Sequence, residues 1–196
     1  MEFTENEIVS LIQQLSLDKD INLSDIPSLD LYMDQVITLF DNKLAHLKRT
    51  ENDKILTKTM INNYTKAKIL MRPNKKKYTR EHIILLILIY NLKQSLSIND
   101  IASLFSVLIE NLDEKNDIEI DKIYESFSKI KKIDTDNISK ELKEKLELIT
   151  ENTNTLNKEH IDLSQMLITV LTLINEANTK KRIAEKIIDE YFINNI

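Results

Sequence analysis

Glycine and cysteine are absent from this chain of 196 residues, and proline occurs only twice. Average usage near 7% would place roughly 14 glycines in a chain of this length. Phosphate-binding glycine loops, dinucleotide fingerprints, nucleophile elbows and calcium loops all need glycine where the backbone takes a positive φ or approaches a ligand closely. The sequence therefore excludes these sites in their standard form. Tight primed hairpins also lose their preferred residue, which favours helices over a sheet-rich fold.

The missing cysteines exclude disulfides, thiolate metal sites and thiol nucleophiles. The three histidines, His46, His82 and His160, lack metal-ligand spacing, and no Glu-x-x-His pair occurs. We therefore expect no metal site, no cofactor and no enzymatic activity. A metal site built only from Asp and Glu on helices is the alternative that the sequence leaves open.

Neither the apolar runs nor the first residues have the pattern of a membrane or exported protein. Residues 1–5 are acidic and lack the basic start and apolar stretch of an export signal. The longest apolar run, Ile83–Tyr90, has eight residues, whereas a membrane helix needs about 20. We expect a cytoplasmic protein with no membrane partner, in which this run belongs to the core.

The formal net charge of −5 hides a strongly basic segment. Between Lys54 and Arg80, hereafter the basic segment, there are nine basic residues and no Asp or Glu, whereas the rest of the chain has 18 basic and 32 acidic residues. A solvated surface normally mixes charges of both signs, so this block is typical of a protein that binds a polyanion. The alternatives are an ordinary basic surface strip and a disordered linker, and the many apolar residues of the segment argue against disorder.

The spacing of apolar residues predicts several helices in the first half of the chain. Their ranges are 4–16, 29–48, 58–65, 80–94 and 97 to about 108, with Thr4, Thr57, Thr79 and Ser97 as caps. The run Ile83–Ile89 is apolar on every side, so we expect its helix to be the central buried one. Within residues 69–78, Pro73 and Asn74 favour a turn between two short extended pieces.

The second half of the chain predicts four further helices, at about 118–132, 137–150, 157–175 and 178–194. The acidic, polar stretch 111–117 predicts a domain boundary. We therefore expect an all-α, mainly helical fold. Residues 1–112 would form a winged helix-turn-helix-like domain with at most a small two-stranded wing, and residues 113–196 a C-terminal helical bundle.

The order of elements from Thr57 to Leu108 resembles the winged-helix DNA-binding domain of the MerR-type regulators. Residues Thr57–Tyr64 resemble its recognition helix, and Ile69–Pro73 resemble the entry to its wing. Lys77–Ile83 are similar to the end of the wing with the following capped helix, and Leu96–Ile101 to the start of the final helix. The resemblance implies a winged helix that binds DNA.

A closer resemblance covers residues 26–105, roughly half of the chain. This stretch is similar to an uncharacterised family of Gram-positive bacterial proteins described as MerR-like predicted regulators. MerR-type domains usually have a glycine where Lys68 stands here, and an arginine where Asn62 stands.

The predicted helix over 58–65 also suits DNA on physical grounds. It buries Met60, Ile61 and Tyr64 while presenting Thr, Asn and Lys, side chains that pair with base edges or reach phosphates in the major groove. The basic residues that follow would contact backbone phosphates. The candidate DNA-binding residues are Lys58, Thr59, Asn62, Asn63, Tyr64, Lys66, Arg72, Lys75, Lys76, Lys77, Tyr78 and Arg80. Two alternatives stay open: the asparagines reflect the general abundance of Asn, which numbers 19, and the tyrosines are core residues.

We therefore expect a DNA-binding transcriptional regulator that acts as a homodimer on double-stranded DNA. The C-terminal helices would dimerise or sense an effector that the sequence does not identify. The second hypothesis is a helical adaptor that binds an acidic protein partner through the basic segment. The order of a groove-compatible helix followed by a wing favours DNA.

Overall fold

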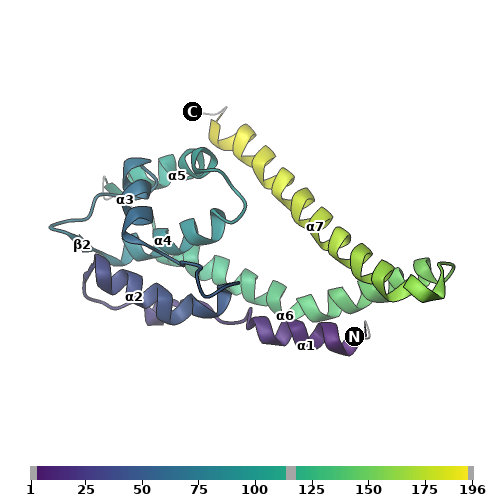
Figure 1. Cartoon of the computed structure of the whole chain (residues 1–196). Helices are drawn as coiled ribbons and strands as arrows, with labels where there is room; N and C mark the ends of the chain where they lie inside the picture. The colour runs from purple at the N-terminus through teal and green to yellow at the C-terminus, as the bar shows by residue number, and fades with distance from the viewer. Residues whose placement is uncertain (1–3, 114–117, 194–196) are drawn as a thin grey trace. The chain divides into compact units, whose positions relative to one another are not determined.

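The computed structural model describes residues 4–113 and 118–193 (Figure 1). Its main helices are α1 (Glu5–Leu15), α2 (Met33–Leu44), α3 (Lys58–Lys66), α4 (Arg80–Leu92), α5 (Ile98–Asp113), α6 (Ile120–Thr153) and α7 (Ile161–Ile188). Shorter helical turns are η1 (Leu23–Asp25), η2 (Ala45–Leu47), η3 (Lys158–His160) and η4 (Asp189–Ile193). The strands β1 (Leu31–Tyr32) and β2 (Lys77–Tyr78) form one antiparallel pair. The prediction of a mainly helical fold with at most a small two-stranded sheet is confirmed.

Contacts within the chain define two compact units. The larger unit comprises Lys19–Lys129 with Ala184–Ile196, and the smaller unit Met1–Asp18 with Ile130–Ile183. Helix α6 contributes its first residues to the larger unit and the remainder to the smaller one. The domain boundary expected at residue 112 adjoins residues 114–117, which lie outside the described residues.

Helix α4 is the centre of the larger unit's core. Five consecutive side chains, Ile83–Ile87, are fully buried, as is Ile89. They belong to one apolar cluster with residues of α2, α3, α5 and the start of α6. The prediction of a central helix is confirmed, because a helix that is apolar on every side is stable in water only when it is surrounded.

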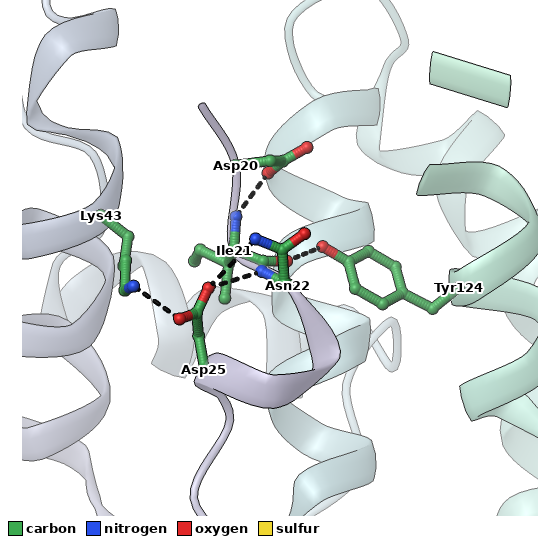
Figure 2. Close-up of polar contacts among 6 residues, drawn as sticks. All are labelled: Asp20, Ile21, Asn22, Asp25, Lys43 and Tyr124. Atoms are coloured by element: carbon green, nitrogen blue, oxygen red, sulfur yellow. Dashed lines mark hydrogen bonds and ion pairs between the residues drawn. The ribbon is translucent and has the colours of Figure 1, made fainter. Parts of the chain in front are cut away.

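The connection from residue 20 to residue 25 is held by polar contacts (Figure 2). The Tyr124 hydroxyl of α6 donates to the Ile21 carbonyl oxygen, and burial raises the pKa of Tyr124 far above its ordinary value. The Asp25 carboxylate accepts from the Lys43 ammonium at 2.6 Å and from the Asn22 backbone at 2.8 Å. The Lys43 contact lowers the Asp25 pKa, so the carboxylate is ionised at neutral pH.

The predicted caps of three helices are present. Thr4 and Glu7 form a reciprocal capping box at α1. The Thr57 hydroxyl accepts from the Met60 backbone N–H at 3.1 Å, and Ser97 and Asp100 cap α5 reciprocally, each at 3.1 Å. These caps follow from local sequence, since the partners lie three residues apart.

Two sets of predicted helix boundaries are wrong. Helix α2 begins at Met33 rather than at residue 29, because Leu31 and Tyr32 are extended and pair with β2. The four predicted helices of the second half are two long ones, since α6 and α7 continue through residues 133–136 and 176–177. A polar side chain in the first of these stretches forms its hydrogen bond within the same helix: the Thr135 hydroxyl donates to the Lys131 carbonyl at 2.9 Å.

In the two described stretches of the chain, the helices fall short of the length and apolar character that crossing a membrane requires.

Candidate nucleic-acid interface

Helix α3 separates a buried side from a polar exposed side. Ile61 and Tyr64 are buried in the core of the larger unit, and Met60 is half-buried. The exposed residues of this helix are Lys58, Thr59, Asn62, Asn63 and Lys66. This matches the division predicted from the sequence, and it presents amide, hydroxyl and ammonium groups on one short helix.

The end of α3 is a complete Schellman motif without glycine. The Ile69 N–H donates to the Tyr64 carbonyl at 3.0 Å and the Lys68 N–H to the Thr65 carbonyl at 3.2 Å. Lys68 takes the left-handed conformation that this motif requires, with φ of 59°. Glycine is the usual residue at this position of the motif, so the left-handed backbone here carries a cationic side chain instead.

The turn of the basic loop, residues 71–78, is centred two residues later than predicted. Lys75 and Lys76 both have positive φ, 49° and 65°, and the Lys77 N–H donates to the Asn74 carbonyl at 2.8 Å. Positive φ at both central residues is the mark of a primed hairpin turn. The lack of glycine thus does not prevent a primed turn here, and the turn places two exposed lysines at its tip.

The strand that follows this turn pairs with a distant segment. Leu31 lies opposite Tyr78 and Tyr32 opposite Lys77. The sheet partner of β2 is therefore the segment 31–32, whereas across the turn Asn74 forms an isolated antiparallel bridge with Lys77. The Lys77 ammonium lies over the Tyr32 ring, 5.5 Å from its centroid, which favours this register.

His82 joins the basic loop to the start of α4. Its Nδ1 accepts from the Thr79 backbone N–H at 3.2 Å, and its Nε2 lies 3.3 Å from the Arg72 carbonyl oxygen. This pairing fits a neutral imidazole with its proton on Nε2. The ring also meets the Tyr78 ring edge to face, with centroids 5.6 Å apart. The buried histidine therefore positions the loop.

Two neighbouring hollows bring α3 and the basic loop together. One, of about 600 Å³, is lined by Asn62 and Lys66 of α3, by Lys76 of the loop and by Tyr32 and Asp34 at the start of α2. The other, of about 930 Å³, is lined by Lys66, Lys68 and Arg72 and by residues of α5 that include Ser106 and Glu110. Lys66 lines both, so the cations of α3 and those of the basic loop share one surface.

A family model matches residues 21–127, more than half of the chain, including α3, the basic loop and α4. The chain belongs to the family Domain of unknown function (DUF1836). No curated protein and no solved structure matches the chain.

The DUF1836 region contains all twelve candidate residues, which differ in exposure. Lys58, Thr59, Asn62, Asn63, Lys66, Arg72, Lys75 and Lys76 are exposed, Lys77 and Arg80 half-buried, and Tyr64 and Tyr78 buried. Burial raises the pKa of both tyrosines, so their hydroxyls are neutral. Their side chains pack in the core, as the alternative interpretation of the sequence stated.

Two candidate cations in the DUF1836 region have partners within the chain. The Lys58 ammonium lies 2.7 Å from the Asp34 carboxylate. The Arg80 guanidinium lies 3.1 Å from Asp121 and donates to the Ile26 carbonyl at 3.2 Å. Within the described ranges, no direct ion pair is formed by Lys66, Lys68, Arg72, Lys75 or Lys76.

Lys68 is absent from the set of candidates chosen on the sequence, yet it lines the same hollow as Lys66 and Arg72. The sequence feature that could have identified Lys68 as a candidate is its place in the basic segment, which contains no Asp or Glu. The sequence contains no signal that α5 lines this hollow, because that contribution depends on packing between separate helices.

Proposed function

We propose that this protein is a MerR-like transcriptional regulator that binds double-stranded DNA in the cytoplasm as a homodimer. In this proposal α3 enters the major groove, and the basic loop lies on the flanking phosphates. The resemblance to MerR-like predicted regulators of Gram-positive bacteria supports the assignment.

The observation that carries the proposal is a set of four cations without ion pairs, Lys66, Lys68, Arg72 and Lys76, which line two neighbouring hollows beside the exposed amides of α3. Lys75 is exposed at the adjacent turn. Lysine and arginine bind phosphates, and each phosphate contact releases a counterion. Asparagine forms a pair of hydrogen bonds with adenine in the major groove. Affinity and base choice would therefore come from adjacent parts of one surface.

A salt titration with random duplex DNA tests the proposal. We expect binding whose logarithm falls with the logarithm of salt concentration by about 0.9 per phosphate contact. The Lys66→Gln, Lys76→Gln variant should lose about two contacts, which lowers the slope by roughly 1.8. Fluorescence anisotropy measures both quantities.

The control removes two lysines of α6 that are also exposed, with Lys132→Gln and Lys140→Gln; these two form ion pairs with Asp136 and Glu144. It changes the net charge by the same amount and should keep the wild-type slope. The proposal fails if folded wild-type protein does not bind DNA at low salt, or if the control loses as much as the test variant. Tighter binding to an acidic polypeptide than to DNA would favour the adaptor hypothesis.

A further inference from the structure

The hollow of about 930 Å³ beside α5, hereafter the α5 hollow, has a lining of two kinds. Its cations are Lys66, Lys68 and Arg72, and all three are exposed. The rest of the lining is mainly apolar and more deeply placed, since these side chains are buried or half-buried: Ala67, Leu70, Met71, Ala102 and Ile109. Exposed positive charge therefore adjoins an apolar floor.

Contacts with DNA do not account for this apolar floor. The parts of duplex DNA that the three cations would reach are phosphates and sugars, which are largely polar. An apolar lining gains free energy only when an apolar partner removes it from water. Cations beside an apolar floor therefore suit a ligand that has both an anionic group and an apolar body.

The charge and the size of the α5 hollow also suit such a ligand. The three cations form no ion pair within the described ranges, and the carboxylate in the lining is that of Glu110. An anionic group would accept charge-assisted hydrogen bonds from the ammonium and guanidinium groups. The volume is within the range of about 300–1,000 Å³ that is typical of small-molecule sites.

Helix α5 determines which end of the ligand would lie where. The Ser106 hydroxyl already donates to the Ser103 carbonyl of its own helix, at 2.9 Å. Its proton is therefore not offered to an anion, and Ala102 and Ile109 add only apolar surface. The apolar body would lie along α5, and the anionic group would lie at the three cations.

We propose that the α5 hollow binds a small organic anion with an apolar body, such as a medium-chain carboxylate, and that the bound anion competes with DNA. The anion neutralises Lys66, Lys68 and Arg72, which are cations that DNA phosphates would otherwise contact. Binding of the anion needs no DNA, whereas the competition rests on the proposed function.

Isothermal titration calorimetry of the full chain with octanoate tests the site. Octanol has the same chain without the charge, and inorganic phosphate has charge without the chain. Each should bind at least about tenfold more weakly than octanoate. The Lys68→Gln, Arg72→Gln variant removes two of the three cations and should weaken octanoate binding about tenfold.

A second variant tests the apolar floor without changing any charge. Ala102→Leu with Ser106→Leu fills the hollow from α5 and should weaken octanoate binding about tenfold or more. The matched control, Ser103→Leu with Val107→Leu, has the same spacing on α5 outside the lining and should bind as the wild type does. Circular dichroism checks that both are folded. Absence of octanoate binding by the wild type, equal binding of octanol, or equal binding by the filled variant would overturn the site.

Fluorescence anisotropy with random duplex DNA tests the competition. Octanoate should weaken DNA binding by the wild type but not by the filled variant, which keeps all its cations. Wild-type DNA binding that octanoate leaves unchanged would overturn the competition. A chain that binds octanoate but never DNA would retain the anion site and refute the proposed function, so the two failures are distinguishable.

Discussion

At the scale of single residues, three lysines of the basic segment occupy backbone positions that suit glycine. Lys68, Lys75 and Lys76 all have positive φ, a conformation that costs a residue with a Cβ roughly 1–2 kcal/mol. Each of them is exposed, and Lys68 and Lys76 line the two hollows of the candidate interface. Strained residues tend to gather at functional sites, and here the strained residues carry the charge.

Replacing Lys68 with glycine should stabilise the fold. The Schellman hydrogen bonds are made by the backbone and remain, while the Cβ strain is removed, so we expect the free energy of unfolding to rise by up to about 1 kcal/mol. Urea denaturation measures the change. The comparison is Lys140→Gly in the interior of α6, which should lower stability by about 1 kcal/mol. Equal destabilisation by both substitutions would refute the strain argument.

At the scale of elements, α3 and the basic loop have different proposed roles. The helix would select the bases, and the loop would supply affinity through phosphate contacts. The exposed asparagines are on the helix, and the turn lysines lie 12 or more residues further along the chain. Base contacts specify and phosphate contacts position. Substitutions in the two elements should therefore have different signatures.

The variant Asn62→Ala should relax specificity without weakening nonspecific binding. On a site selected from random sequences we expect it to lose about 1–3 kcal/mol of discrimination, while its affinity for random duplex stays at the wild-type value. Binding titrations with the selected site and with random DNA measure both. Asn42→Ala on the exposed side of α2 is the control and should change neither. A loss of random-DNA affinity equal to the loss on the selected site would contradict a role in base readout.

At the scale of the whole molecule, the candidate interface and the exposed apolar residues of α7 belong to different compact units. The candidate interface lies in the larger unit, whereas the smaller unit contains the exposed side chains of Leu163, Leu167, Val170, Leu171 and Ile174. The family match ends at residue 127, before α7 begins. The residues proposed to bind DNA are therefore separate from the exposed apolar residues of α7.

This separation predicts that substitutions on one of these two surfaces leave the other unchanged. The Leu167→Glu, Val170→Glu variant should keep wild-type salt dependence per chain on random DNA, because its five unpaired cations are unchanged. The Lys66→Gln, Lys76→Gln variant should keep the mass of the proposed homodimer. Fluorescence anisotropy measures DNA binding and sedimentation measures the mass of both variants. If either variant lost both DNA binding and the dimer mass, the surfaces would not be independent.

What could be predicted from the sequence depended on interactions between near neighbours. The caps at Thr57 and Ser97 join residues three apart, and the central place of α4 follows from a run that is apolar on every side. The polar exposed side of α3 was predicted for the same reason, since helical periodicity divides its residues into two sides.

The features that only the tertiary structure decided join residues far apart. Leu31 and Tyr32 have no local reason to be extended; their pairing with residues 77–78 makes them a strand. The hollow shared by Lys66, Arg72 and α5 exists only after separate helices pack. For α7 the sequence by itself determined an apolar stripe, whereas packing on α6 decided that the polar residues Gln165 and Thr169 are buried. Periodicity specifies the faces of a helix, but the neighbour available to it determines which face is covered.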